Sequence, residues 1–310
     1  MTDDEFDALR RSAFGIAYRM LGSVSEAEDV VQEGLLRLHR ARERGERIES
    51  PRAYLSTVVS RLSLDELRSA RVRRETYVGD WLPEPLEAST DDDPGQRLEM
   101  ADSLSLAFLV LLESLTPEHR AAFLLREVFD EPYDRIAEII GTSPQNARQL
   151  AARARHQVEE RRPRFQSTRE QQEQLAARFF AAAEEGDLEG LEQLLAHDVV
   201  LRADGGGKAP AFKQSIHGRV RAAKTLIGGL RASARFGSFH LRPALVNGQP
   251  GALFADEDGN LGAVIVLEFA GGQIQTVSSI ANPDKIRHLG PVADLNAVWR
   301  RRGEQAAGDR

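Results

Sequence analysis

The sequence of 310 residues contains no cysteine, which excludes disulfide bonds, thiolate metal sites and cysteine nucleophiles. It has no run that approaches the roughly 20 apolar residues of a membrane-spanning helix. The first residues, MTDDEFDALRR, are acidic with a helical pattern, unlike a signal peptide with its apolar run and cleavage site. These absences predict a cytoplasmic protein with no membrane partner.

Motifs for catalysis are also absent. The stretch Asp204-Gly205-Gly206-Gly207-Lys208 lacks the Walker spacing of a phosphate loop, since Ala209 follows the lysine. Polar groups available to an enzyme cavity are Asp204, His217, His240 and Asp256. Asp204 is expected in a flexible glycine loop and Asp256 in a hairpin turn, where acids usually serve as turn formers. No spacing specifies an acid–base pair, so the sequence predicts no catalytic residue, no cofactor and no metal site.

The formal net charge is −7, although nucleic-acid-binding domains are usually basic. The distribution of charge matters more than the total. Two arginine-rich stretches, Arg61–Arg74 and Arg148–Arg164, flank an acidic segment from Asp80 to Asp102 that contains one arginine. This pattern fits a protein that contacts phosphate in two places and keeps its own linker off the DNA.

Helical patterns occupy residues 5–75 and 103–164. In the first stretch, apolar residues recur at three-to-four spacing, and Gly22-Ser23 separates two helices, of which the second is expected to be capped by Ser25. Ser50 is the expected N-cap of a third helix, with Pro51 at its first position. The segment between the two helical stretches, residues 76–102, is rich in Pro, Gly and acids and is predicted to be a linker.

From about residue 168 the pattern changes to an α+β domain. Helices are expected at 175–185 and 188–195. Short β-like runs follow at 199–202, 239–246, 251–254, 262–269 and 273–280. The turns at 255–260 and 271–272 have hairpin chemistry, so we expect helices followed by an antiparallel meander.

A helix-turn-helix is the sharpest local signal, over residues 132–147. One short helix buries Ile136, Ala137 and Ile140 and stops at Gly141, and Ser143 or Thr142 caps the next. This geometry places a second helix in the major groove of DNA. Its expected base contacts are Gln145, Asn146, Arg148 and Gln149, while Arg153 and Arg155 are expected on phosphate.

Three motifs in order resemble the sigma-70 family. Residues 25–33 (SEAEDVVQE) resemble its region-2 helix, 51–68 the promoter-reading helix that follows, and 115–123 (LTPEHRAAF) the opening of region 4, completed by the helix-turn-helix. The spacing leaves no room for a region 3. The chain thereby resembles the extracytoplasmic-function (ECF) group of alternative sigma factors.

The resemblance narrows to the ECF subgroup that fuses a SnoaL-like domain of nuclear-transport-factor-2-like (NTF2-like) fold to the sigma core. The linker residues 80–85 (DWLPEP) and the segments 204–208 and 282–285 (NPDK) are similar to its marks. We therefore expect two all-α sigma domains followed by an α+β domain. The expected boundaries are 1–75 for region 2, 76–102 for the linker, 103–164 for region 4, 168–290 for the SnoaL-like domain and 291–310 for a tail.

The resemblance implies roles for particular residues. Residues implied to dock on the polymerase clamp are Asp29, Gln32, Glu33 and Leu36. Residues implied at the −10 element are Tyr54, Arg61, Arg68 and Arg71; Tyr54 replaces a common tryptophan and Arg61 a common asparagine, so the arginines are expected mainly on the DNA backbone. For Asp65 two roles stay open: a structural pair with a nearby arginine, or a functional contact. The helix-turn-helix would read the −35 element.

The fused domain is implied to regulate the sigma core. Trp81 in an acidic loop suggests a partner surface, and one hypothesis is that it packs against the C-terminal domain and sets the spacing of the sigma domains; a local anchor for the linker is the other. The implied regulatory residues are Trp81, Pro83, Asp204, Gly205, Gly206, Lys208, Asn282, Pro283, Asp284 and Lys285. The implied partners are RNA polymerase core, through its clamp and flap, and promoter DNA at −10 and −35, without a separate anti-sigma factor.

Two alternatives from other classes stay open. One is a free-standing helix-turn-helix regulator with a ligand-sensing tail, which would have no use for the region-2 helix. The other is a small-molecule enzyme with a DNA-binding tether. Neither explains both basic stretches and the acidic linker.

Overall fold

The computed structural model describes residues 3–87, 104–161, 168–234 and 239–296. The chain divides into two compact units. The helical unit comprises Met1–Thr76 and Phe108–Arg162, and the sheet unit comprises Tyr77–Ala107 and Pro163–Arg310. The segment that follows the first helical stretch therefore belongs to the same unit as the C-terminal sheet.

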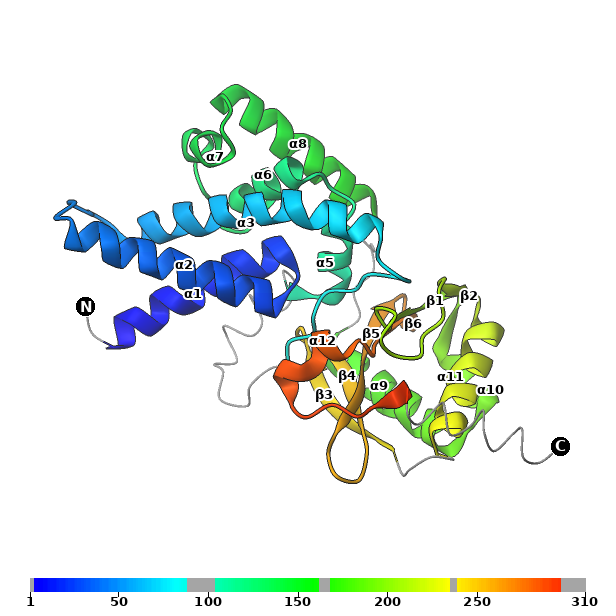
Figure 1. Ribbon diagram of the computed structural model, residues 1–310. Helices are drawn as coiled ribbons and strands as arrows, with labels where there is room; N and C mark the ends of the chain where they lie inside the picture. Colours follow the sequence, from blue (N-terminus) through cyan, green and yellow to red (C-terminus); the bar gives the residue numbers. More distant parts are fainter. Residues whose placement is uncertain (1–2, 88–103, 162–167, 235–238, 297–310) are drawn as a thin grey trace. The chain divides into compact units, whose positions relative to one another are not determined.

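The helical unit begins with three helices, drawn in blue to cyan in Figure 1: α1 (Asp3–Leu21), α2 (Val24–Glu43) and α3 (Pro51–Glu75). Their buried faces include Ile16, Met20, Val31 and Leu55. Ser50 caps α3, as expected, by accepting the Ala53 N–H at 3.2 Å. The expected cap of α2 at Ser25 is wrong: Ser23 is the N-cap and accepts the Glu26 N–H at 3.2 Å.

The described residues that follow form α5 (Leu106–Leu112), whose first two residues are counted with the sheet unit, and then α6 (Pro117–Glu127), α7 (Tyr133–Ile140) and α8 (Pro144–Arg161) of the helical unit. Thr116 caps α6, and Pro117 occupies the first turn, where its missing N–H costs nothing. α8 packs on α6 and α7. Ala147, Ala151 and Ala154 are buried on this face of α8, and their small side chains let the helices approach closely.

The sheet unit is a six-stranded sheet with the order β2-β1-β6-β5-β4-β3. The strands are β1 (Leu195–Asp204), β2 (Ile216–His217), β3 (His240–Val246), β4 (Gln249–Ala255), β5 (Leu261–Ala270) and β6 (Gln273–Ile280). Strands β3 to β6 form the expected antiparallel meander. The sheet is not wholly antiparallel, however, because β1 pairs with β6 in parallel.

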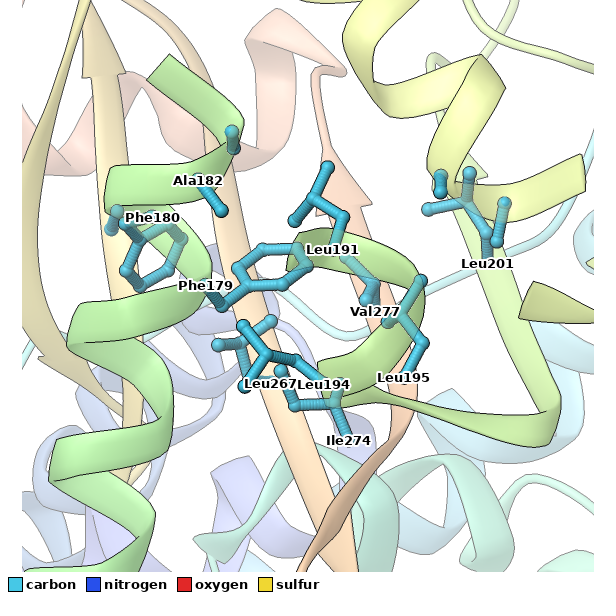
Figure 2. Close-up of a cluster of buried hydrophobic side chains, with 14 of the residues drawn as sticks. Phe179, Phe180, Ala182, Leu191, Leu194, Leu195, Leu201, Leu267, Ile274 and Val277 are labelled. Atoms are coloured by element: carbon cyan, nitrogen blue, oxygen red, sulfur yellow. The ribbon is translucent and has the colours of Figure 1, made fainter. Parts of the chain in front are cut away.

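Three helices cover one face of this sheet: α9 (Arg169–Glu185), α10 (Leu188–Leu194) and α11 (Arg219–Ala234). Figure 2 shows Phe179 and Phe180 of α9 packed among Leu191, Leu267 and Ile274. Burying each such side chain contributes roughly 1.5–3 kcal/mol. The sequence patterns did not predict α11 or β2. A short helix, α12 (Pro283–Ile286), and a 3-10 turn, η1 (Arg287–Leu289), follow β6.

The expected fold class is confirmed in its architecture: all-α segments precede an α+β unit that consists of helices and one six-stranded sheet. No helix in the described part of the chain is long and apolar enough to cross a membrane.

Candidate nucleic-acid interface and linker anchor

The helix-turn-helix is formed by α7 and α8. Gly141 ends α7 in the left-handed region at φ 79°, a conformation that costs glycine little. Ser143 then accepts the Asn146 N–H at 3.2 Å and caps α8. Ile136, Ala137 and Ile140 are buried, as the pattern required.

The candidate −35 residues of α8 are all exposed: Gln145, Asn146, Arg148, Gln149, Arg153 and Arg155. Asn146 donates to Thr142 Oγ1 at 2.7 Å, and Arg155 lies 3.6 Å from Glu159 and 3.8 Å from Glu127. Within the part of the chain that the structure describes, Gln145, Gln149 and Arg153 have no hydrogen-bond or ion-pair partner. These three side chains are available to an external ligand without breaking a contact.

Arg148 is held by an aromatic ring. Its Cζ lies 5.0 Å from the ring centroid of Tyr133, and the Cζ of Arg126 lies 5.2 Å from the same centroid. A guanidinium over an aromatic face is attracted by the ring quadrupole. Tyr133 therefore restricts the directions that Arg148 can take at the start of the recognition helix.

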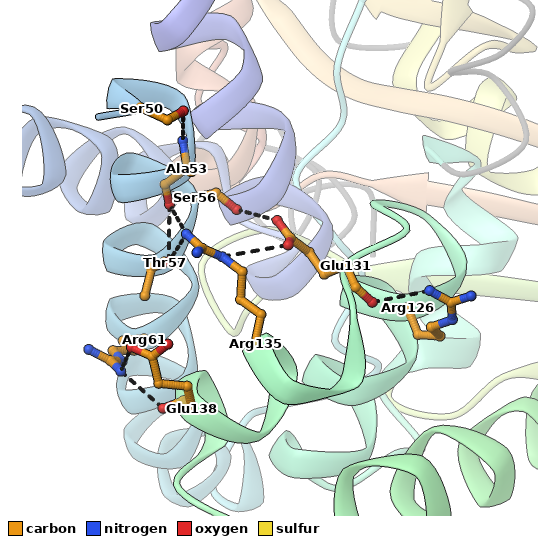
Figure 3. A network of polar contacts seen from close by, with 9 residues as sticks. All are labelled: Ser50, Ala53, Ser56, Thr57, Arg61, Arg126, Glu131, Arg135 and Glu138. Carbon is orange, nitrogen blue, oxygen red and sulfur yellow. Dashed lines mark hydrogen bonds and ion pairs between the residues drawn. The ribbon is translucent and has the colours of Figure 1, made fainter. Parts of the chain in front are cut away.

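Two of the candidate −10 residues of α3, Arg61 and Arg68, contact acids of α7 and α6. Arg61 Nη2 lies 3.0 Å from both the backbone oxygen and Oε1 of Glu138 (Figure 3). Arg68 pairs with Glu118 at 3.0 Å and with Asp65 at 3.2 Å, so Asp65 does pair with a nearby arginine. Tyr54 is half-buried. Arg71 lies within α3, and its side chain falls outside the described residues.

A second set of contacts joins α3 to α7 and the loop before it. Arg135 donates to the Ala53 carbonyl and, at 2.5 Å, to Thr57 Oγ1. Ser56 donates to Glu131 Oε1 at 3.2 Å, as Figure 3 shows. The backbone of α3 is thus bonded to α7, the first helix of the helix-turn-helix.

Arg120 joins α6 to α1 from a buried position. It is 2% exposed and donates to the carbonyls of Met20 at 2.6 Å and Leu112 at 3.1 Å. It also pairs with Glu113. A buried guanidinium with these acceptors is well satisfied, and removing it would take a donor from each of the two carbonyls.

The candidate polymerase-docking residues share one face of α2. Asp29, Gln32 and Leu36 are exposed, and Glu33 is half-exposed and pairs with Arg37 at 2.7 Å. Leu36 exposes 39% of its surface, which is unusual for a large apolar residue in the described chain. An apolar side chain with acids beside it on a helix suits a partner with an apolar and basic surface.

The linker is anchored by a buried ion pair of the sheet unit. Asp204 is fully buried at the end of β1 and accepts Lys285 Nζ at 2.7 Å, the Leu82 N–H at 2.8 Å and the Tyr77 hydroxyl at 2.6 Å. The expectation of a flexible loop acid at Asp204 is wrong, because β1 continues two residues past the predicted run 199–202 and both carboxylate oxygens are bonded.

Two aromatic rings of the linker lie beside Lys285. Its Nζ is 4.0 Å from the ring centroid of Trp81 and 5.0 Å from that of Tyr77. Trp81 is half-buried rather than exposed, and Pro83 is buried. Burial, and then the hydrogen bond to Asp204, raises the pKa of the Tyr77 hydroxyl well above its usual value. We call Tyr77, Trp81, Asp204, Asn282 and Lys285 the linker anchor.

The glycine loop and the 282–285 segment complete the linker anchor. Asn282 caps α12 and donates to the Tyr77 hydroxyl at 2.8 Å. Gly206 has a positive φ of 56°, and a Cβ there would lie 2.2 Å from Asn282 Nδ2; a Cβ at Gly205 would lie 2.3 Å from the Ala209 oxygen. Lys208 pairs with Asp284, and Pro283 occupies the first turn of α12. The structure therefore brings the predicted regulatory residues together.

Sequence patterns missed several residues of these sites. Tyr77 of the linker donates to Asp204, while Asn247 and His288 bond the linker from the C-terminal domain; His288 lies 2.7 Å from the Pro85 oxygen. An Asn-Gly pair at 247–248 signals a hairpin turn, but nothing in it signals a linker contact. Of the other polar groups, His217 and His240 are exposed and Asp256 caps its turn by accepting the Asn260 N–H. No metal-binding group of side chains occurs among the described residues.

Comparisons with known proteins decide the family. The model of Sigma-70 region 2 matches residues 6–73 and that of Sigma-70, region 4 matches 105–158. The ECF RNA polymerase sigma factor SigJ of Mycobacterium tuberculosis is 39% identical over 295 residues, covering 92% of this chain and 93% of the relative. The chain belongs to the ECF sigma factors.

Other comparisons agree with this assignment. The sigma factor is 32% identical to a probable ECF RNA polymerase sigma factor SigI of the same species, covering 88% of this chain and 91% of that one. The crystal structure of M. tuberculosis SigJ matches with a TM-score of 0.74 and 35% identity, covering 94% of this chain and all of that one. The protein is thus an alternative sigma factor that acts in transcription initiation, in a family that binds RNA polymerase core and promoter DNA. The free-standing regulator is not favoured.

Proposed function

We propose that this sigma factor is controlled by its own C-terminal domain, which acts in place of a separate anti-sigma factor. The observation that carries the proposal is the linker anchor. The residues that follow region 2 are bonded to the C-terminal domain from Tyr77 to Glu87, among them through Leu82 to Asp204 and through Pro85 to His288. The domain therefore holds the segment that joins the two DNA-binding regions.

The contacts within the helical unit support a closed state of the free sigma core. Arg61 and Arg68, the proposed −10 contacts, are engaged by Glu138 and Glu118. A carboxylate beside an arginine occupies the site that a DNA phosphate would take. In this proposal, promoter binding requires α3 to exchange these acids for DNA, and holding the linker opposes that exchange.

The proposed roles of the other residues follow from their exposure. The exposed face of α8 would read the −35 element as duplex, with Gln145, Asn146, Arg148 and Gln149 on bases and Arg153 and Arg155 on phosphate. Tyr54, Arg61, Arg68 and Arg71 would lie at the −10 element. Asp29, Gln32, Glu33 and Leu36 would dock on the polymerase clamp, and region 4 on the flap.

We propose that the C-terminal domain is a regulatory module and not an enzyme. The carboxylate that could serve as a base, Asp204, is committed to Lys285 and to the linker. A base needs access to its substrate, and this one has none of its surface exposed. We also propose that the protein works in the cytoplasm, without a cofactor or a membrane partner.

The test is single-round run-off transcription with purified core polymerase at limiting sigma factor. Trp81→Ala loosens the linker anchor at a half-buried ring, and Lys224→Ala, on the exposed side of α11, is the matched control. We expect Trp81→Ala to raise promoter output by about fivefold, a typical coupling between two sites. Equal output from Trp81→Ala, Lys224→Ala and the unmodified protein would reject control by the fused domain.

A further inference from the structure

A single asparagine bonds two points of the chain, one inside the linker and one just after it. Asn247 Oδ1 accepts the Leu86 N–H at 3.0 Å, and its Nδ2 donates to the Leu104 oxygen at 2.9 Å. Its own backbone N–H donates to the Leu86 oxygen at 2.7 Å. The donor and the acceptor of one side-chain amide thus hold two chain segments that are far apart in sequence.

The position of Asn247 in its hairpin is unusual. It lies with Gly248 in the turn between β3 and β4, with φ values of 52° and 73°, as a two-residue hairpin turn of this type requires. Such turns are normally solvated, yet Asn247 is only 3% exposed. Turn geometry alone would be met by an exposed Asn-Gly pair, so the burial and the paired amide need another reason.

Neighbouring contacts reinforce both attachments. On the first side, Glu87 forms a β-bridge with Val246 and pairs with Arg242 at 3.2 Å. On the second side, the Leu106 N–H, which has no partner inside the first turn of α5, donates to Gln249 Oε1 at 3.2 Å. The hairpin β3–β4 therefore contacts the linker at residues 86–87 and the start of region 4 at residues 104–106.

The attachment changes the reach of the linker. Residues 87–103 would span up to roughly 56–61 Å if extended, or about 21–25 Å as a flexible coil. With both ends bonded to Asn247, this length adds nothing to the separation between the two sigma regions. The separation is then limited by the short stretches outside the clasp.

We propose that Asn247 is a clasp that sets the promoter spacing this sigma factor accepts, meaning the number of base pairs between the −35 and −10 elements. The inference rests on the proposed function, since it assigns a specificity role to the domain that holds the linker. Each added base pair lengthens the required span by about 3.4 Å and rotates one element around the helix axis. A short tether penalises such changes, and a long one tolerates them.

The variant that tests the clasp is Asn247→Gly. Glycine keeps the turn and the backbone bond to Leu86 and removes both side-chain bonds. Asn260→Gly is the matched control, because Asn260 stabilises the β4–β5 turn through Asp256 alone, at 2.7 and 2.9 Å. Asn247→Asp is a second, milder variant that keeps the acceptor for Leu86 and removes only the donor to Leu104.

The first readout is hydrogen exchange at the Leu86 amide in the full chain. Asn247→Gly is expected to speed its exchange at least about tenfold, while Asn260→Gly and Asn247→Asp leave it protected. The second readout is single-round run-off transcription on promoters whose spacing varies by single base pairs. The spacing preference is the ratio of transcript from the best spacing to transcript from spacings one base pair shorter or longer. Asn247→Gly is expected to lower this ratio at least about fivefold, and Asn247→Asp is expected to give a ratio between those of Asn247→Gly and Asn260→Gly.

The outcomes separate the clasp from the wider proposal. A spacing profile of Asn247→Gly that matches Asn260→Gly overturns the clasp, whether or not Leu86 exchanges faster. If Trp81→Ala still raises total output in that case, control by the fused domain stands. If neither variant changes output or profile, both proposals fall.

Discussion

Lys285 Nζ lies 2.7 Å from Asp204 Oδ2, and these side chains expose only 7% and 0% of their surface. Taking both charges out of water is costly, and the cost is offset only when the remaining donors and acceptors are also bonded. Here Leu82, Tyr77 and Trp81 supply those partners, and all three belong to the linker. The pair is therefore satisfied only while the linker is in place.

Breaking one side of this pair is expected to destabilise the sheet unit. Lys285→Ala leaves a buried, unpaired carboxylate, which costs about 3–5 kcal/mol. The double variant Asp204→Asn with Lys285→Met removes both charges and is expected to lose less than Lys285→Ala alone. Urea unfolding followed by circular dichroism measures both. The control is Lys208→Ala, whose pair with Asp284 is exposed and is worth at most about 1 kcal/mol; a loss for Lys285→Ala as small as for this control contradicts the account.

Stability is expected to fall at alkaline pH because of Tyr77. Its pKa is raised in the folded protein, so the folded state holds the hydroxyl proton more tightly than the unfolded state does. The resulting stability is present below the unfolded pKa of about 10 and is lost as pH rises through the folded pKa. Tyr77→Phe is expected to flatten this fall in a series of thermal melts above pH 9.5. A slope unchanged by the substitution would show that other groups cause it.

Removing Glu138 is expected to favour the open sigma core. Glu138→Ala removes the carboxylate that pairs with Arg61 and leaves only the bond to the backbone oxygen of residue 138. An exposed ion pair contributes up to about 1 kcal/mol, so binding to a −10 single strand should tighten by up to roughly fivefold. Fluorescence anisotropy with labelled DNA measures the change. Glu43→Ala removes an exposed acid of α2 that pairs only with His39 among the described residues and serves as the control. The interpretation fails if Arg61→Ala leaves the gain from Glu138→Ala intact.

Tyr133 is expected to tune −35 binding through Arg148. Tyr133→Ala removes a cation–π contact worth about 0.5–1 kcal/mol, which weakens binding to a −35 duplex by roughly twofold to fivefold. Tyr133→Phe keeps the ring face and should bind like the unmodified protein. Arg148→Ala is expected to lose more, about 1–3 kcal/mol for a base contact. Anisotropy titrations at one fixed salt concentration compare the three variants. Equal binding by Tyr133→Ala and Tyr133→Phe would show that the Tyr133 ring does not contribute to −35 binding.

Sequence patterns predicted the local structure well where one residue type has one geometric role. Gly141 stopped α7 and Ser50 capped α3 because left-handed backbone and an oxygen acceptor are needed there whatever the tertiary structure. Ser23 and Ser25 are two candidate caps that lie two residues apart. Because α2 already begins at Val24, directly after the helix break at Gly22-Ser23, Ser23 is the cap. The amphipathic signal of α11 is interrupted by Gly228-Gly229, so that helix was missed.

Apart from Tyr77, the residues of the linker anchor were predictable from the family resemblance, but their geometry was not. The family resemblance pointed to Trp81, Asp204 and Lys285, while the burial of Asp204 depends on strand pairing between β1 and β6, which no local pattern specifies. The linker contact of Asn247 could not be predicted from the sequence for a related reason. An Asn-Gly turn is fully explained by its hairpin, and its second use depends on the linker lying beside it.

The most direct test of the central claim measures whether the anchored linker keeps the sigma core closed. Because the protein has no cysteine, Arg40→Cys on α2 and Gln157→Cys on α8 introduce two specific label sites at exposed positions. Single-molecule energy transfer then reports the distance between regions 2 and 4 in the free protein. The account predicts one short-distance population that shifts partly to longer distances in Trp81→Ala. An identical distance distribution with and without Trp81 would contradict it.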